Sequence, residues 1–527
     1  MECRIDDLPD VLLEYILSLI PPYKDLQECK LVSKRWFHAT KNVIQHNKAH
    51  FQKSVAYGSL LWSAWPCSID WMPTIGKRHS HSACMYDNSM YVFGGCTATC
   101  TTFNDLWRLD LDTRTWVRLI TMGSYPSPKS CATMLYYKKS FILFGGWSYP
   151  SPYPLHQQWK LFNELHVYSI ESNKWIVINT LESPPPTSAH SASIHKNNMV
   201  VFGGICNGYR SNDVWCLNLD SYSWHKQTTS NLKPHPRYGQ SQIELGDYHL
   251  LVLGGCTGPN VAMNDVWLLK MEGTTWTWKK VHMHNTKWAP TRIWCNQACK
   301  VGNYVIVLSI NKCQKKSNDM NISLKKVTSQ RTAPPRTCDS DNSHERQEND
   351  SRIDRDVNVN GRHGSFSRAS VQNAHSSSHP PNFTKSLPLC NDNVLSMAAF
   401  RDEPVRNGSN SNRQRQLESI RRMEERIRNR ITQLKATKRT GNTLSIFVLD
   451  ITNVLCDECS ASWIPLKHNN QSGPDERILY SLVAGRGELI VFGGIRKEQT
   501  SLQSHPDMDE SEVYNDLYFI NPPRYVI

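Results

Sequence analysis

The feature that most constrains the fold of this chain is a pair of glycines that closes an apolar run at five places. The pairs stand at 94–95, 145–146, 203–204, 254–255 and 493–494, and the first four are 51, 58 and 51 residues apart. Asparagine, an acidic residue and an apolar residue follow each pair, as in Asn104-Asp105-Leu106. A period near fifty residues indicates a repeat architecture with one supersecondary unit per repeat.

Each unit has the residue pattern of short strands. Apolar and polar residues alternate, as in Trp107-Arg108-Leu109-Asp110-Leu111, which predicts strands rather than helices. Four strands per unit at this period predict a mainly β protein, a β-propeller. A strand that stops beside a crowded central axis requires positive φ or no side chain, which accounts for the glycines. Large aromatic residues suit the contact between adjacent blades. We assign that role to the tryptophans that lie nine residues beyond the residue after each of the first four triplets: Trp116, Trp175, Trp224 and Trp276.

These motifs resemble the kelch repeat family over about residues 68–310 and 443–527. One period beyond Gly254 falls on Ser309-Ile310, and the next falls on Gly493 once the segment 311–442 is set aside. We therefore expect a six-bladed kelch β-propeller whose fifth blade is split by that insertion. We also expect the segment IDWMPTIG, with Trp71, to supply the strand that completes the sixth blade and removes an exposed sheet edge.

The insertion differs in composition from the rest of the chain. It holds 25 Lys and Arg against 14 Asp and Glu, and it contains no Trp or Tyr. This composition predicts a long disordered basic insertion. Within it, residues 413–439 carry apolar residues at helical spacing and predict a basic amphipathic helix. Such a helix could bind a partner helix, an acidic surface or RNA, or could simply lie solvated on the propeller.

The first fifty residues have a helical pattern instead. Leu12, Leu13, Ile16 and Leu17 recur at helical spacing, and Pro21-Pro22 ends that helix. Together with the Leu8-Pro9 start and the Leu-Val-Ser-Lys-Arg-Trp ending, residues 1–50 resemble the F-box family, and residues 51–67 are expected to be a linker. The resemblance implies docking to a Skp-type adaptor of a cullin-RING ubiquitin ligase. It implies a role in adaptor binding or in the F-box core, which sequence does not separate, for Leu8, Pro9, Leu12, Leu13, Ile16, Leu31 and Val32.

We find no motif of a known catalytic or metal site. The chain has no P-loop, GxSxG or HExxH, and Cys456 and Cys459 form a CxxC without a second pair. Cys96 and Cys100 flank a loop, but the repeat explains their surroundings better than a metal does. Some kelch-like propellers are copper oxidases, yet no Tyr/His/Cys set at fixed spacing supports that class here. We expect no catalytic residue, metal or cofactor.

Targeting and membrane segments are also not expected. The N-terminus MECRIDDLPD is acidic rather than a signal peptide, and no uncharged apolar run approaches the ~18 residues that span a bilayer. The scattered cysteines fit reduced thiols. We therefore expect an intracellular protein, cytoplasmic or nuclear, without a membrane partner.

The long connections between strands offer the expected substrate surface. Tight turns such as Asp87-Asn88 share one face of a propeller, and every long connection lies on the other face, where recognition usually occurs. The loop 147–162 is rich in aromatic residues and proline, which suits binding hot spots. The candidate substrate-binding residues are Trp147, Tyr149, Tyr153, Trp159 and Arg210.

Taken together, the two resemblances imply the substrate-recognition subunit of an SCF-type (Skp-Cullin-F-box) ubiquitin ligase. Such a subunit holds a protein substrate near the ubiquitin-loaded enzyme and needs no catalysis of its own. The alternative is a non-ligase interaction scaffold that binds protein or nucleic acid through the propeller and the basic insertion. Nucleic acid is not the partner that we expect.

Overall fold

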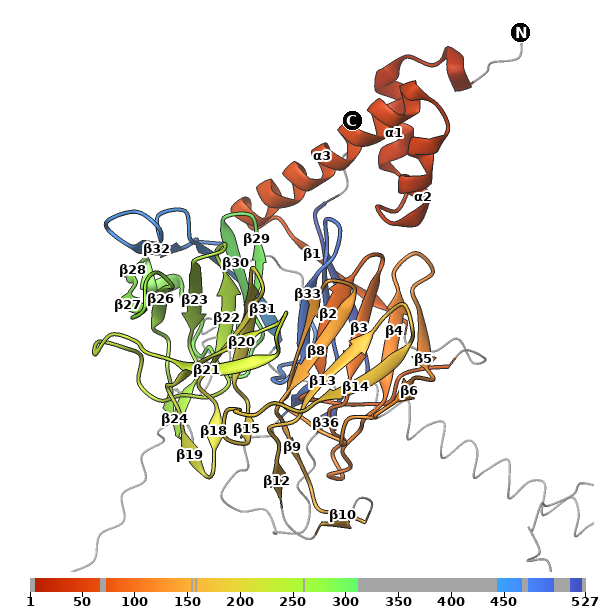
Figure 1. Ribbon diagram of the computed structural model, residues 1–527. Coiled ribbons are helices and arrows are strands. Elements are labelled where there is room, and N and C mark those ends of the chain that lie inside the picture. The colour runs from red at the N-terminus through yellow and green to blue at the C-terminus, as the bar shows by residue number, and fades with distance from the viewer. Residues whose placement is uncertain are drawn as a thin grey trace, which may run out of the picture. The chain divides into compact units, whose positions relative to one another are not determined.

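The computed structural model describes residues 5–66, 73–152, 155–156, 159–258, 261–310, 443–466, 473–496 and 512–523. All of these residues belong to one compact unit, whose boundaries are Met1–Ile322 and Arg439–Ile527. The predicted disordered insertion and its helix at 413–439 lie outside the described residues. The fold is mainly β, with helices at the N-terminal end (Figure 1).

The N-terminal helices pack around a small apolar core of their own. They are η1 (Ile5–Asp7), α1 (Asp10–Ser18), α2 (Lys24–Glu28), η2 (Cys29–Leu31) and α3 (Lys34–Tyr57). Their shared core contains Leu13, Leu17, Leu26, Ala39 and Val43. Ser33 caps α3 by accepting a hydrogen bond from the Trp36 amide at 3.2 Å, and Gly58 ends it with a left-handed φ of +66°. The helix therefore runs into residues 51–67, which the sequence led us to expect as a linker.

The described strands form six antiparallel blades, each with four strands in order from the axis outward. Blades 1 to 3 are β2 (Ser82–Tyr86), β3 (Ser89–Phe93), β4 (Leu106–Asp110), β5 (Thr115–Leu119); β7 (Thr133–Tyr137), β8 (Ser140–Phe144), β13 (Leu165–Ser169), β14 (Lys174–Ile178); and β16 (Ser191–His195), β17 (Asn198–Phe202), β20 (Val214–Asn218), β21 (Ser223–Gln227). Blade 2 gains a parallel outer strand, β6 (Met122–Gly123).

The second half of the ring has the same order of strands. Blades 4 to 6 are β22 (Ser241–Glu244), β23 (His249–Leu253), β26 (Val266–Lys270), β27 (Thr277–Lys280); β29 (Cys299–Val301), β30 (Tyr304–Ile310), β31 (Leu444–Asp450), β32 (Ser460–Trp463); and β33 (Ser481–Ala484), β34 (Leu489–Phe492), β37 (Leu517–Asn521), β1 (Leu61–Trp65). Blade 5 gains a parallel outer strand, β28 (His282–His284), and η3 (Thr286–Trp288) follows it.

Blade 5 confirms the position expected for the insertion. Its strands β30 and β31 lie on either side of residues 311–442, and they pair continuously from Tyr304↔Asp450 to Ile310↔Leu444. The two ends of the insertion are therefore neighbours across a single pair of antiparallel strands. All four strands of the blade lie among the described residues.

The strand that completes blade 6 is not the one we predicted. An N-terminal strand does close the blade, but it is β1, which pairs with β37 from Leu61↔Asn521 to Trp65↔Leu517. Trp71 itself lies outside the described residues. The reason is that α3 delivers the chain to the edge of blade 6 directly after Gly58, so the first extended residues take the empty edge.

The paired glycines stand where successive blades approach most closely. In blade 1, Gly94 and Gly95 have φ values of +65° and +89°. A Cβ at Gly94 would lie 2.5 Å from the Lys129 carbonyl oxygen of blade 2, and one at Gly95 would lie 2.7 Å from the His79 carbonyl oxygen of blade 1. Moreover, the Gly95 amide donates to Lys129 O at 3.0 Å. Both parts of the expectation hold, because the conformation and the space each require glycine.

The acidic residue and the tryptophan of each repeat also have structural roles. Asp105 accepts from the buried Arg78 guanidinium at 2.8 Å, which joins the segments that lead into β2 and β4 of blade 1. Trp116 packs on Phe492 of blade 6 with 4.9 Å between ring centroids. The same contact recurs between successive blades in the pairs Trp175–Phe93, Trp224–Phe144 and Trp278–Phe202.

In blade 4 the residue between blades is Trp278, not the predicted Trp276. Trp278 pairs with Leu269, the register that Trp116 has with Leu109 in blade 1. The turn from Lys270 to Thr277 is two residues longer than its counterpart in blade 1. The fixed spacing of nine residues therefore pointed to a tryptophan that is only partly buried.

Candidate interaction surfaces

The F-box-like helices present an apolar surface to solvent on the side away from their core. Leu12 and Ile16 on α1, and Leu31 and Val32 at the end of η2, are exposed, with Leu31 at 85%. Pro9 is exposed and Leu8 is half-buried. Leu13, by contrast, is fully buried in the helical core. The structure thus separates one predicted residue as core from a group that is accessible to a partner.

Three further exposed apolar residues extend this surface beyond the predicted set. They are Val11, Tyr15 and Leu19, on or just beyond α1. Leu12, Ile16 and Leu19 follow one another at four and three residues, so helical spacing alone could have identified Leu19 as part of the stripe.

The two faces of the propeller differ in their connections. Tight turns join successive strands at one end of the blades, and the long connections lie at the other end. Several long connections form small sheets of their own: β9 (Trp147–Ser148) with β12 (Lys160–Leu161), β10 (Ser151–Pro152) with β11 (Leu155–His156), β15 (Thr187–Ser188) with β18 (Ile205–Cys206) and β19 (Tyr209–Arg210), β24 (Cys256–Gly258) with β25 (Val261–Ala262), and β35 (Ile495–Arg496) with β36 (Glu512–Val513). These short strands gather at one end of the blades in Figure 1.

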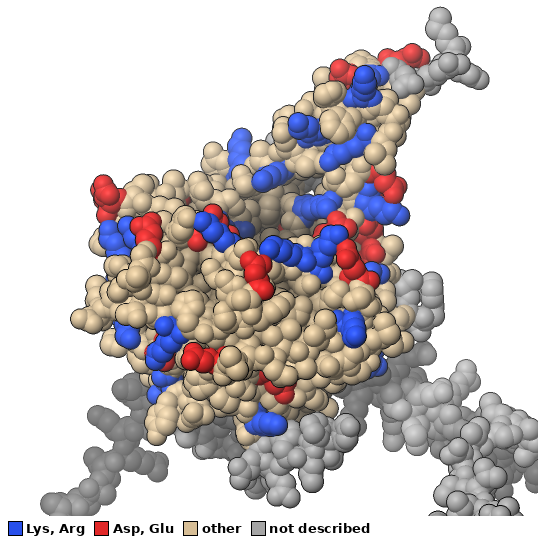
Figure 2. Space-filling model, in the orientation of Figure 1, with Lys and Arg blue, Asp and Glu red and all other residues tan. Residues whose placement is uncertain are grey.

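Ion pairs between neighbouring turns run along the short-turn face. Lys138 pairs with Asp220 at 3.1 Å, and Arg486 pairs with Asp87 at 3.2 Å. On the side of the molecule that Figure 2 shows, charges of both signs mix along this end of the blades. Because the cations of these pairs each have an anion beside them, the pairs give this face no strong field of one sign.

On the long-loop face, three of the predicted substrate-binding residues form one aromatic cluster. Trp147 and Trp159 stack with 4.6 Å between ring centroids, and Tyr149 meets both edge-on at 4.7 and 4.8 Å. Trp159 is 65% exposed. The Tyr149 amide donates to Thr102 Oγ1 of blade 1 at 3.4 Å, so the cluster spans two adjacent blades.

The other two predicted residues are not part of this cluster as described. Tyr153 lies outside the described residues. Arg210 is exposed on β19, in the long connection of blade 3. Its guanidinium lies 3.7 Å from the position of a Cβ built on Gly258, in the connection of blade 4.

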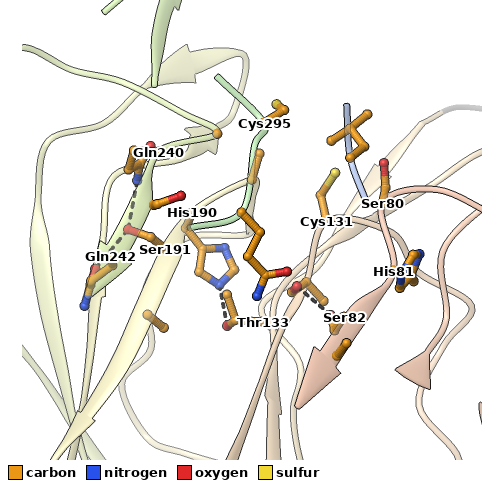
Figure 3. Close-up of a pocket in the computed structure, with 18 of the residues that line it drawn as sticks. Ser80, His81, Ser82, Cys131, Thr133, His190, Ser191, Gln240, Gln242 and Cys295 are labelled. Atoms are coloured by element: carbon orange, nitrogen blue, oxygen red, sulfur yellow. Dashed lines mark hydrogen bonds between the residues drawn. The ribbon is translucent and has the colours of Figure 1, made fainter. Parts of the chain in front are cut away.

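A cavity of about 230 Å³ lies at the axis where the inner strands begin (Figure 3). None of the described residues that line it is Lys, Arg, Asp or Glu. Its side chains are engaged in bonds between neighbouring blades. Thr133 Oγ1 lies 2.9 Å from His190 Nε2, and the Ser191 hydroxyl donates to Gln242 Oε1 at 2.9 Å. These groups hold blades together rather than forming an open catalytic set.

A closed ring of backbone hydrogen bonds encircles the axis at this level. One residue of each blade has a left-handed φ and donates its amide to the carbonyl of the same residue in the preceding blade: Ser80, Cys131, Ala189, Gly239, Cys295 and Leu479. Residues other than glycine adopt this conformation at some energetic cost, and here each is held by its two neighbours. This ring could not be predicted from the sequence, because the six residues share no side-chain chemistry.

The titratable groups at the axis are in their neutral forms at neutral pH. Burial lowers the pKa of His190 to about 3 and that of His81 well below its ordinary value. Burial also raises the pKa of the Cys131 and Cys295 thiols. Groups held so far from their working pKa are poor proton-transfer catalysts near pH 7.

The two cysteines that flank the first long loop, Cys96 and Cys100, differ in their surroundings. Cys96 is buried with its sulfur 3.2 Å from His79 Nε2, while Cys100 is exposed. Among the residues that the structure describes, no group of three or more His, Cys, Asp or Glu could hold a metal ion. In the same part of the chain, no helix is both long enough and apolar enough to cross a membrane.

Comparison with known protein families finds two matches. Residues 5–45 match the F-box-like family, and residues 78–276 match the β-propeller domain of FBX42. Mouse kelch domain-containing protein 1 is 28% identical over 44% of this chain and 61% of its own length. Rat kelch domain-containing protein 3 is 30% identical over 36% of this chain and 51% of its own length.

The chain therefore spans at most about three fifths of the length of these relatives. The solved structure of YjhT aligns with 46% of this chain and 76% of its own, with 17% identity and a TM-score of 0.38. The first match falls on the N-terminal helices, and the second covers blades 1 to 3 and the first three strands of blade 4. In these two parts the chain resembles the F-box plus kelch-repeat proteins, F-box only protein 42 among them.

Proposed function

We propose that this protein is the substrate-recognition subunit of an SCF-type ubiquitin ligase. The observation that carries the proposal is that the exposed apolar stripe of the helices and the long-loop face of the propeller are separate surfaces. The F-box-like helices keep an exposed apolar stripe, and their contacts with the propeller fall on the short-turn face, at residues such as Asp112 and Glu488. Among the described residues, the helices thus leave the long-loop face uncovered.

The apolar stripe suits a Skp-type adaptor. F-box domains in general bind such adaptors, and an exposed contiguous apolar surface marks a protein–protein interface. We assign adaptor binding to Leu8, Pro9, Leu12, Ile16, Leu31 and Val32, and remove Leu13 from the predicted set because it is buried.

We assign substrate binding to the long-loop face, with the aromatic cluster Trp147, Tyr149 and Trp159 as its anchor. Large rigid aromatic residues dominate the energetics of interfaces because they bury much area at low entropic cost. Tyr153 and Arg210 stay as proposed contributors from the same face. A partner held there would be presented to the ubiquitin-loaded enzyme in the same complex, which makes transfer effectively intramolecular.

Adaptor capture tests the proposal and separates it from a non-ligase scaffold. Leu12→Ala with Leu31→Ala removes two exposed apolar contacts, and truncating a central contact typically costs ~2 kcal/mol, about thirtyfold in affinity. The matched control is Leu181→Ala, a fully exposed leucine on the propeller. We expect the double variant to lose the adaptor in pull-down with a recombinant Skp-type adaptor, and the control to retain it. A wild-type chain that captures no adaptor would favour the scaffold.

A further inference from the structure

We infer that the F-box helices and the propeller form a single rigid body, joined by a buried anchor at Tyr23 and by the C-terminal half of α3. The inference deepens the proposed function, because it means that an adaptor and a substrate would be held at a fixed separation. It depends on contacts between residues hundreds of positions apart in the chain.

The first contact is a tyrosine of the helical part that lies in the core of the propeller. Tyr23 is fully buried, and it packs in one cluster with Phe492 and Phe519 of blade 6 and Trp107 of blade 1. Its hydroxyl donates to Glu488 Oε1 at 2.5 Å. Burial and the Glu488 carboxylate raise the pKa of Tyr23 far above its ordinary value, so the phenol stays a donor at any physiological pH.

Glu488 connects this tyrosine to the next blade. Its second oxygen accepts from Arg114 at 3.0 Å, and the Arg114 guanidinium lies 3.6 Å from the centre of the Phe519 ring. A buried carboxylate with two such partners is expensive to break, because the loss of one partner leaves a desolvated charge. The turns of blades 1 and 6 are thereby fixed to the helical part.

The propeller also supplies a cap to an F-box helix. The N-cap of α2 is Tyr23, whose own side chain makes no capping bond. Instead, the Lys24 amide donates at 2.6 Å to Asp112 Oδ1 in the turn between β4 and β5. A carboxylate at a helix N-terminus satisfies a free amide and complements the helix dipole.

A second contact surface lies along α3. Phe51 and Val55 are buried in one cluster with apolar residues of blades 5 and 6, including Leu308 and Leu482. A Cβ at Gly302, in the turn of blade 5, would lie 2.9 Å from the side chain of Gln52. With Tyr23 on blades 6 and 1 and α3 on blades 5 and 6, the helical part is fixed at separate points, which opposes rotation as well as separation.

Rigidity matters for the proposed role because the rate of an intramolecular transfer depends on the effective concentration of the two ends. A fixed separation gives a high effective concentration when the geometry fits, whereas a loose joint spreads the same ends over a larger volume. The lysines of a bound substrate would thus approach the ubiquitin-loaded enzyme from one direction.

Hydrogen exchange on the full chain, read by mass spectrometry, tests the inference without any ligase activity. In Tyr23→Ala we expect amide exchange at least tenfold faster both in α2 and in the propeller turn 485–488. Tyr57→Ala, which removes an exposed tyrosine from the same helical part, should leave both regions unchanged. Should Tyr23→Ala not fold, Tyr23→Phe keeps the ring and removes only the bond to Glu488, with a smaller change expected in the same two regions.

The inference is overturned if exchange increases in α2 alone, or if calorimetry of the wild-type chain resolves separate transitions for the helices and the propeller. Ubiquitin transfer is then a separate measurement. If the exchange result holds and Tyr23→Phe slows transfer while adaptor and substrate binding persist, the fixed separation serves the ligase. A chain with coupled exchange that supports no transfer in the presence of bound adaptor would count against the proposed function alone.

Discussion

The closure of blade 6 by β1 predicts that two neighbouring prolines in that strand will destabilise the whole propeller. We consider Ser63→Pro with Ala64→Pro, at the centre of β1. Alternate residues of an edge strand donate their amides to the partner strand, so one of these two positions must donate to β37. The double substitution removes that bond whichever position it is, because proline has no amide hydrogen.

The size of the effect follows from the contacts of β1. One ladder hydrogen bond contributes about 1 kcal/mol. Two edge-on aromatic pairs, Trp62–Tyr518 at 6.1 Å and Trp65–Phe519 at 6.3 Å between ring centroids, join β1 to β37. Each such pair contributes about 1 kcal/mol. Detachment of the strand should therefore cost about 3 kcal/mol, besides exposing the edge of β37 to aggregation.

Equilibrium unfolding in guanidinium chloride, followed by tryptophan fluorescence, measures this cost. The matched control is Ile69→Pro with Asp70→Pro, in the segment that the sequence led us to expect as the closing strand. We expect the control to lower the free energy of unfolding by less than about 1 kcal/mol, a value within the range of surface substitutions. A control that destabilises more than the β1 variant would refute the assignment of β1 and restore the Trp71 strand.

Two further predictions use the same measurement. Trp278→Ala should lower the free energy of unfolding by about 3–5 kcal/mol, as for a buried tryptophan, whereas Trp276→Ala should lower it by clearly less. Equal losses in the two variants would contradict the register of β27. Acidification should also destabilise the fold, because His190 binds a proton more readily when unfolded, near pKa 6.5, than when folded, where its pKa is about 3. The stabilising contribution of neutral His190 is complete above about pH 6.5 and falls by up to about 1.4 kcal/mol per pH unit below it. His190→Gln should therefore lose less of its free energy of unfolding between pH 6.5 and 5 than the wild-type protein does. Parallel curves of unfolding free energy against pH for the two proteins would disprove this role.

Sequence alone predicted the parts of the fold that the repeat imposes on every blade. The glycine pair that begins with Gly94 and Gly95 recurs in five of the six units because these blades must approach the next, and only blade 5 has Ser309-Ile310 at that position. The same logic located the split in blade 5, since period arithmetic needs no knowledge of the insertion. It failed at Trp276, where a turn two residues longer moved the contact to Trp278.

The contacts that join the F-box helices to the propeller could not be predicted in this way. Tyr23 and Glu488 stand outside the repeat pattern, so no equivalent position in another blade marks them. They are also 465 residues apart in the chain. A lone tyrosine between a proline pair and a short helix has no periodicity that marks it as buried. Its partner lies in a turn that sequence identifies only as tight.

The candidate substrate surface could be predicted from the sequence only in part. The repeat fixes where each long connection emerges, so the face could be predicted, but it places no constraint on what a connection contains. Trp147 and Trp159 were identifiable because they are aromatic residues in such a connection, and their stacking follows from the pairing of β9 with β12. The helices that Tyr23 anchors contact the short turns, so within the described part of the chain they do not cover the long loops, which favours that face. A partner of this propeller is therefore expected to meet the surface whose sequence is least determined by the fold.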